Sequence, residues 1–478
     1  MGYFIITDEQ KTKASENTTS NVRKVQMDNP VLEDSGIPLN VKEKEVNISN
    51  PESHCLICGA SGKGKTRRVL YPLVTMSARA GRSMVIADMK GEIYRNTAKE
   101  VKKCGLNVKV INLRNPTTGN RYNPFSLIQK YWNQGNHSRA SILLKDIVDL
   151  LVQDVKSSRD KYWENAAKDV IIGISLLLLE RNIPLSFSTI TDTFNTIVKA
   201  DEKREDTWSE ESIETVQELK AVLADGPNSG RRLSSWLNVT HPNTKGCINS
   251  EVGVVISKYV DQEDIRDLLS YSDINMTDLG KKPTAIYFIC PDESTALYDI
   301  ASLFVEQCYS ELIHFADNSE ENRLKVKVDF ILDEFGSFIG SDWPSKLTAA
   351  RSRGIRFILA LQNLSQLTAR YGAENAKTIE TNCRTLMFMG GRDLELIATL
   401  VAFTKENSPI TGQTLMQLKM GDVAILDDAG TTYLGHLPDW TAWNITERAS
   451  LCTTKRNPAQ PYEIDLSSLL NKYREFLF

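Results

Sequence analysis

The sequence contains no apolar run long enough to cross a membrane. Its densest apolar stretch, Val170 to Leu179, is interrupted by Gly173 and Ser175, whereas a membrane-spanning helix needs about 20 predominantly apolar residues. The N-terminal residues 1–19 also lack the basic and then apolar order of a signal peptide. These absences predict a cytoplasmic chain without a transmembrane helix of its own.

Cysteine and histidine are scarce as well. Eight cysteines in 478 residues are too few for a disulfide scaffold. Cys55 and Cys58 form a C-x-x-C pair, but no second pair follows at the spacing of a zinc site, so core packing is favoured over metal binding. The five histidines show neither metal-site spacing nor the order of a catalytic triad.

An excess of charge of one sign is absent too. The net charge is −4, so no positive field covers the whole protein, and this total argues against a nucleic-acid partner. The distribution is uneven, however, with −2 in residues 1–50, +11 in 51–135, −8 in 136–280 and −5 in 281–478. The basic segment is expected to face nucleotide or DNA, whereas the acidic segment suits a basic protein partner.

A second basic stretch lies between Lys346 and Arg392, with eight basic and two acidic residues. Phosphate contacts from these side chains would give salt-sensitive binding that does not depend on base sequence. A solvated helical face explains the same composition equally well, so both interpretations stay open here.

Alternating strand and helix patterns predict an α/β fold with a mostly parallel sheet covered by helices. The first part has strand patterns at 54–58, 83–87 and 105–113, with a helix at 65–79. Strand patterns return at 284–290, 326–332, 356–361, 385–389 and 421–426.

The strand patterns fade between 136 and 280, where apolar residues recur every three or four positions, as in 140–152, 163–179 and 212–223. This periodicity predicts an all-α insertion. Trp163 could stack on a base, although its helical spacing favours core packing. The predicted organisation is a mobile polar arm with one short strand in 1–50, a nucleotide-binding domain in 51–135 and 281–450, the insertion in 136–280, and a tail in 451–478.

A glycine-rich loop follows the first strand and precedes a helix, and it fits the pattern G-x-x-x-x-G-K-[ST]. Its residues are Gly59, Ala60, Ser61, Gly62, Lys63, Gly64, Lys65 and Thr66. The backbone N–H groups of such a loop wrap phosphate oxygens, Lys65 reaches the β- and γ-phosphates, and Thr66 binds Mg²⁺. The loop predicts ATP and Mg²⁺ as cofactors.

Two adjacent carboxylates, Asp333 and Glu334, close the apolar strand that ends at Leu332. Together with the phosphate loop they are typical of a nucleotide hydrolase. Asp333 is expected on the Mg²⁺ side, and Glu334 is expected to act as the general base that activates water for attack on the γ-phosphate.

Further polar residues complete the predicted site. Gln362 follows the strand that should lie beside the Asp333 strand, where its amide could sense hydrolysis, although it could also be a plain helix cap. Arg351 is the preferred candidate to reach ATP on a neighbouring subunit, with Arg384 as the alternative. Arg353 shares the same turn as Arg351, and a solvated basic turn remains open for both.

These motifs together resemble the coupling-protein ATPases of type IV secretion and conjugation, the VirD4/TraG family of additional-strand RecA-like P-loop ATPases. The resemblance extends from about His54 to Trp440. Residues 85–92 are similar to the family's strand ending in D-P-K-G-E, with Met89 in place of the proline. Further matching blocks are Y-N-P-F at 122–125, Y-W-E-N-A-A at 162–167, L-D-E-F-G at 332–336, A-R-S-R-G at 350–354 and L-Q-N-L-S-Q-L at 361–367.

The resemblance implies a homohexameric ATPase at the cytoplasmic mouth of a type IV secretion channel. Such a protein recruits relaxase-bound single-stranded DNA or protein effectors, and its helical insertion faces the cytoplasm for docking. The family usually begins with a membrane anchor, whereas about fifty polar residues precede this P-loop. The expectation is that the anchor was removed, or that a separate membrane protein holds the chain at the cytoplasmic face of the membrane.

Two other functions remain open on the sequence alone. One is a cytosolic double-stranded DNA translocase of the FtsK/HerA kind, against which the large acidic insertion argues. The other is a nucleotide-gated adaptor that binds relaxase or effector proteins and hydrolyses little ATP.

Overall fold

The computed structural model groups into two compact units. The first comprises Met1–Arg114 and Asn275–Thr453, and the second comprises Asn115–Ile274 and Thr454–Phe478. The first segment of the second unit overlaps the insertion predicted at 136–280, but this segment begins and ends earlier in the chain. The structure describes residues 22–153, 161–202, 221, 226–291, 297–340, 342–406, 408–445, 447–451, 454–460, 462 and 464.

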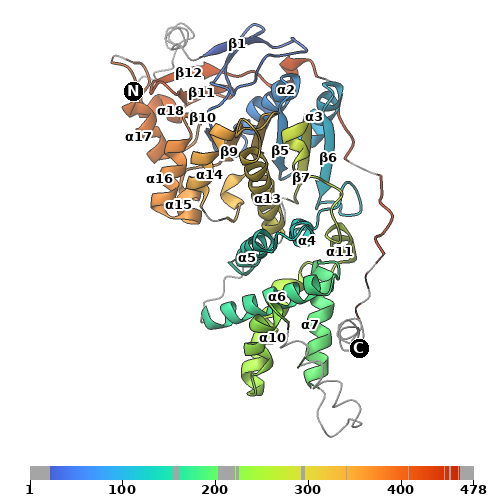
Figure 1. Cartoon of the computed structure of the whole chain (residues 1–478). Coiled ribbons are helices and arrows are strands. Elements are labelled where there is room, and N and C mark those ends of the chain that lie inside the picture. The colour runs from blue at the N-terminus through green and yellow to red at the C-terminus, as the bar shows by residue number, and fades with distance from the viewer. Residues whose placement is uncertain are drawn as a thin grey trace. The chain divides into compact units, whose positions relative to one another are not determined.

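A nine-stranded sheet runs through the first unit (Figure 1). Its strands are β4 (Cys55–Cys58), β5 (Ser83–Asp88), β6 (Asn107–Asn112), β7 (Thr284–Ile289), β8 (Val328–Leu332), β9 (Ile355–Leu361), β10 (Thr385–Phe388), β11 (Asp422–Leu426) and β12 (Thr432–His436). Their order is β12-β11-β10-β4-β9-β8-β5-β7-β6. The strands from β10 to β6 are parallel, whereas β11 is antiparallel to both of its neighbours. The predicted mostly parallel α/β fold is confirmed.

All parallel strands except β6 are buried along their whole length, because helices cover both faces of the sheet. On one face, α2 (Tyr71–Arg79) and α3 (Glu92–Lys103) share a buried cluster with alternate strand residues such as Ile358. Phe357 points to the other face, where its ring lies 5.7 Å from that of Trp343 in α14 (Trp343–Ala350).

β9 is the additional strand that distinguishes this subclass of RecA-like folds. β9 pairs with β4 on one side and with β8 on the other. The strand before Gln362 therefore lies between the strand of the glycine-rich loop and the strand of the carboxylate pair. The prediction that the Gln362 and Asp333 strands are neighbours is confirmed.

A separate three-stranded antiparallel sheet lies near the N-terminus, where the sequence predicts a mobile arm with one short strand. It consists of β1 (Arg23–Gln26), β2 (Pro38–Lys42) and β3 (Glu45–Ile48) in the order β1-β3-β2. Leu39 of β2 and Val46 of β3 are buried. The turn between these strands uses Glu43 at φ 57°. A few apolar residues are enough to hold these short strands, because they pack in one buried cluster with residues of the large sheet.

A buried ionic cluster lies at the amino edge of the large sheet, where the parallel strands begin. The Asp329 carboxylate in β8 accepts hydrogen bonds from Arg82 at 2.7 Å and from Arg356 at 2.5 Å. The Ser77 hydroxyl donates a further bond at 2.7 Å. All three charged side chains are at most 3% exposed. The two guanidinium groups hold the pKa of Asp329 at about 2, against the opposing effect of its burial.

The regular secondary structure in the described residues of the second unit is helical, apart from one isolated bridge between Thr118 and Lys455. Its helices are α4 (Ser126–Asn133), α5 (His137–Gln153), α6 (Lys161–Glu180), α7 (Phe187–Glu202), α9 (Ser229–Leu237), α10 (Pro242–Ser257) and α11 (Glu263–Leu268). Apart from residue 221, the helix predicted at 212–223 lies outside the described residues. Across the described part of the chain, no helix has the length and apolarity needed to span a membrane.

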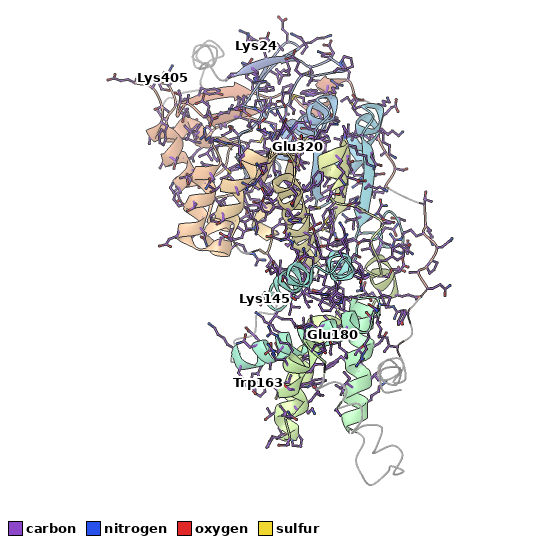
Figure 2. The ribbon with its side chains drawn as sticks, viewed as in Figure 1. Lys24, Lys145, Trp163, Glu180, Glu320 and Lys405 are labelled. Atoms are coloured by element: carbon purple, nitrogen blue, oxygen red, sulfur yellow. The ribbon has the colours of Figure 1, made fainter. Side chains whose placement is uncertain are left out.

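Trp163 and Glu180 mark the two ends of α6 (Figure 2). Trp163 is half-buried, and its ring packs edge-on against that of Tyr162 with centroids 5.0 Å apart. Glu180 accepts hydrogen bonds from the backbone N–H of Asn228 at 2.9 Å and the Ser229 hydroxyl at 2.6 Å. Glu180 thereby holds the start of α9 against the end of α6.

Candidate nucleotide-binding site

The glycine-rich loop connects β4 to the helical segment that begins at Lys65. Gly62 and Gly64 have φ values of 77° and 90°, a left-handed conformation that favours glycine. The loop is fixed from both sides, because Gly59 N–H donates to Leu361 O at 3.2 Å and Ala60 N–H donates to Gly390 O at 3.0 Å. These bonds hold the loop open between the ends of β9 and β10.

Lys65 lies inside this loop. The side chain is buried, and its ammonium donates to the carbonyl of Gly59 at 2.6 Å. Thr66 follows in the first turn and is half-buried, whereas the neighbouring Lys63 turns away to the carbonyl of Leu418 at 3.3 Å. Of the two loop lysines, Lys65 is therefore the one whose ammonium group is held inside the loop.

The carboxylate pair follows β8 at the carboxyl edge of the sheet, where the parallel strands end. Asp333 N–H donates to Ala87 O at 3.3 Å, which fixes the turn against the end of β5. Burial and, to a smaller extent, the nearby carboxylates of Glu334 and Asp88 raise the pKa of Asp333 to about 7, while Lys65 opposes them. The structure thus brings the loop lysine and the carboxylate pair into one electrostatic site.

Asp88 also belongs to this site, although in the sequence it stands out only as part of the block at residues 85–92. It ends β5, beside β8, and is 1% exposed. Its carboxylate accepts the N–H of Tyr94 at 2.8 Å, yet burial still raises its pKa to about 6. The sequence feature that could have identified Asp88 as a site residue is its position as an acidic residue at the end of a predicted strand.

Glu334 and Gln362 contact each other across the ends of β8 and β9. The Gln362 amide donates to the two carboxylate oxygens of Glu334 at 3.2 and 3.4 Å. The side chain of Gln362 is therefore not a helix cap. Glu334 has a φ of 54°, which a residue with a Cβ adopts at some cost. Strained backbone of this kind is concentrated at functional sites.

The arginine candidates lie at the opposite, amino edge of the sheet. Arg351 and Arg353 form the short helix immediately before β9, and Arg384 immediately precedes β10. Arg353 pairs with Asp317 at 2.9 Å, and Arg384 faces Asp428 at 3.6 Å. Within one chain, none of them is brought to the glycine-rich loop.

Most charges of the basic stretch 346–392 are engaged by the protein itself. Six of its eight basic residues have a carboxylate or carbonyl partner, and the two others, Arg351 and Arg392, are exposed and have no partner among the described residues. The six are Lys346, Arg353, Arg356, Arg370, Lys377 and Arg384. Few of these charges are left for phosphate contacts.

The C-x-x-C pair is fully buried in β4, where burial raises the pKa of both thiols far above the ordinary range. Among the residues that the structure describes, no three His, Cys, Asp or Glu side chains gather as metal ligands would. The Thr66 hydroxyl and the Asp333 carboxyl are hard oxygen donors that suit Mg²⁺, an ion that keeps several waters and takes further ligands from phosphates.

The glycine-rich loop between strand and helix, the carboxylate pair on a neighbouring strand and the extra strand between them define a P-loop nucleotide-binding fold. A family model for the type IV secretory system conjugative DNA transfer proteins matches residues 6–398. The chain belongs to this family. No curated protein matches its sequence.

Solved structures of a bacterial conjugative coupling protein, TrwB, share the fold. The complex of TrwB with the ATP analogue ADPNP is 14% identical, covers 88% of this chain and 95% of that chain, and has a TM-score of 0.59. The complex with ADP and Mg²⁺ is 15% identical, with 88% and 94% covered and a TM-score of 0.58. The unbound monoclinic form is 14% identical, with 88% and 93% covered and a TM-score of 0.56.

Proposed function

We propose that this chain is the coupling ATPase of a type IV secretion or conjugation system. It binds ATP and Mg²⁺ and uses hydrolysis to recruit relaxase-bound single-stranded DNA or protein effectors and feed them to the channel. Family membership supports the transfer role. The observation that carries the ATPase role is the contact between Gln362 and Glu334 beside Lys65 and Asp333.

The loop residues 59–66 would bind the phosphates of ATP through their backbone N–H groups, with Lys65 between the β- and γ-phosphates. Thr66 and Asp333 would hold Mg²⁺, which neutralises charge on the phosphates when bound. Asp333 must be ionised for this role. Its raised pKa means that it keeps a proton more readily than an ordinary aspartate does, until cations come close.

Glu334 would accept a proton from the attacking water. The amide of Gln362 holds its carboxylate at the end of β9, so Gln362 is a positioning residue for the base and is placed to respond when the γ-phosphate leaves. The positive φ of Glu334 supports this assignment, because strained backbone conformations cluster at functional sites.

Arg351 would act on ATP bound to another copy of the chain. Its position before β9, at the edge of the sheet opposite the glycine-rich loop, leaves no role toward its own nucleotide. An arginine supplied in this way stabilises charge on the transferring phosphoryl group. Arg384 is the weaker candidate because it faces Asp428. The active form proposed here is a homohexamer.

The substrate and membrane partners follow from charge and family. Residues 136–280 carry a net charge of −8, which suits a basic relaxase or effector better than bare DNA. We place the protein in the cytoplasm at the cytoplasmic face of the membrane, held there by channel components or by a separate membrane-anchor protein.

Glu334→Gln tests the proposal. We expect the purified variant to bind ATP normally and to lose hydrolysis by about 10²- to 10⁴-fold, the usual contribution of a general base, and we expect cells carrying it to lose DNA or effector transfer. Glu374→Gln, a change at an exposed carboxylate in α16 (Ala373–Asn382), is the control.

Two other outcomes would redirect the assignment. Normal transfer by the Glu334→Gln variant would favour the nucleotide-gated adaptor. Translocation along duplex DNA without relaxase or channel proteins would favour the FtsK/HerA-like motor.

A further inference from the structure

The loop that follows β10 lies against the glycine-rich loop. β10 pairs with β4 in parallel, and the pairing continues past the strand ends, where Met389 N–H donates to Cys58 O at 2.8 Å. Ala60 N–H then donates to Gly390 O at 3.0 Å. Residues Gly390 to Asp393 therefore border the phosphate loop on the side away from β9.

This loop is held in one conformation. Gly390 and Gly391 have φ values of 98° and 147°, which only glycine adopts readily. The Asp393 carboxylate accepts the N–H of Leu364 at 2.6 Å, just after Gln362, and the N–H of Leu396 at 3.1 Å at the start of α17 (Leu394–Ala402). One carboxylate thus ties the loop to the segment that carries Gln362.

Arg392 is the basic residue of this loop. It is exposed and forms no hydrogen bond or ion pair with any residue in the described part of the chain. It lines a pocket of about 500 Å³ together with Ala60 and Ser61 of the glycine-rich loop. The other wall of this pocket includes Gln362 and Asn363.

We propose that the guanidinium of Arg392 binds the γ-phosphate of ATP held by its own chain. The proposal rests on the ATPase function given above and extends its site. The γ-phosphate is favoured over the α- and β-phosphates because the pocket is shared with Gln362, whose amide contacts the expected general base Glu334. A planar guanidinium pairs with phosphate oxygens through two parallel N–H donors.

The charges around Arg392 support a role for a cation at this place. Glu395 also lines the pocket and has an exposed carboxylate, which repels a phosphate. The negative charge of Asp393 is already met by two backbone donors. Arg392 is the basic residue of this lining, so its positive charge can balance the negative charge of Glu395 and attract the phosphate.

Binding of a non-hydrolysable ATP analogue and of ADP, each with Mg²⁺, tests the assignment in full-length protein diluted to the monomer. We expect Arg392→Ala to weaken the analogue by about 10- to 100-fold, as for a lost charged hydrogen bond, and to weaken ADP by less than about 3-fold. Arg392→Lys should keep part of the affinity for the analogue. Lys377→Ala, which removes an exposed charge from the same stretch, should bind both nucleotides as the unchanged chain does.

Three results would overturn the proposal. Equal losses for the analogue and ADP would place the arginine on another part of the nucleotide. Unchanged affinity for the analogue would remove Arg392 from the site altogether. A loss seen only at concentrations where the chain assembles would mean that Arg392 acts on a neighbouring copy. Failure of the unchanged chain to bind either nucleotide would instead contradict the ATPase function itself.

Discussion

The two edges of the large sheet shift the pKa of a buried aspartate in opposite directions. Asp329 and Asp333 stand at the two ends of β8, four positions apart in the chain. At the amino edge, two arginines hold the pKa of Asp329 at about 2. At the carboxyl edge, burial and two neighbouring carboxylates raise the pKa of Asp333 to about 7.

The difference separates a carboxylate that stabilises the fold from one that we propose binds a ligand. Asp329 has partners for its charge within the protein, namely Arg82, Arg356 and the Ser77 hydroxyl. Asp333 has the opposite surroundings, with Glu334 and Asp88 close by and Lys65 as the cation that opposes them. A cluster with this excess of negative charge attracts a cation from solution. Mg²⁺ is such a cation.

The strongest test of this comparison is the loss of each aspartate in turn. Asp329→Ala leaves the buried guanidinium of Arg356 without a carboxylate and that of Arg82 with Asp34 alone, so we expect the free energy of unfolding of the first unit to fall by about 3–5 kcal/mol. Asp333→Ala removes a carboxyl whose charged form burial disfavours, so near pH 7 it should raise the free energy of unfolding instead of lowering it. Urea denaturation of both variants measures the effect, and equal losses would break the comparison.

The pH dependence of stability should have opposite signs at the two edges. Since the folded-state pKa of Asp329 lies below its ordinary 3.8, its stabilising contribution is present above about pH 4 and is lost as pH falls toward 2. Since the folded-state pKa of Asp333 lies above 3.8, its contribution is present below about pH 4 and is lost as pH rises toward 7.

Asp333→Asn should therefore flatten the decrease in stability between pH 5 and 7. Asp88, whose pKa is about 6, adds a decrease of the same sign that remains in the variant. Urea midpoints at several pH values would show the change in slope. Asp342→Asn, a change at an exposed carboxylate, serves as the control, and a slope that Asp333→Asn leaves intact would contradict the assignment.

The smallest expected effect comes from the strained backbone at the carboxyl edge. Glu334 has a φ of 54°, so Glu334→Gly should raise the free energy of unfolding by about 0.5–1 kcal/mol, because glycine adopts this conformation without the steric cost. Glu334→Gln keeps the strain and removes the charge, so it measures the repulsion from Asp333 separately. A Gly variant no more stable than the Gln variant would show that the turn stores no strain.

The central sheet was predictable because its strands are short apolar runs bounded by turns. The runs ending at Cys58, Leu332 and Leu361 all appear as buried strands, and the motif positions fix which strand ends carry polar residues. In a parallel sheet those ends meet at one edge, so the convergence of Lys65, Asp333 and Gln362 follows from the pattern. Only one short strand was predicted near the N-terminus, where three form a sheet, because the apolar residues of these strands are too few to stand out.

The roles of the arginines were harder to predict. The partners of Arg356 and Arg384 lie far away in the sequence, at Asp329 and Asp428, and no local pattern reveals them. The edge on which each arginine lies was available in principle, because a residue before a parallel strand lies at the amino edge and one after it at the carboxyl edge. That rule separates Arg351 from Arg392 without any coordinates.

The burial of β9 has a mechanical consequence. All seven of its residues are buried, and parallel neighbours hydrogen-bond it on both sides. At about 3.3 Å per residue, it is a stiff segment about 23 Å long with Gln362 after one end and the Arg351 turn before the other. Sliding by one residue would reverse the face of every side chain, so β9 moves with its neighbours or not at all. In the proposed ring, a movement of the Gln362 end of β9 at one nucleotide would therefore move the Arg351 turn at the other end by a similar amount. That turn is the surface proposed to face the next subunit.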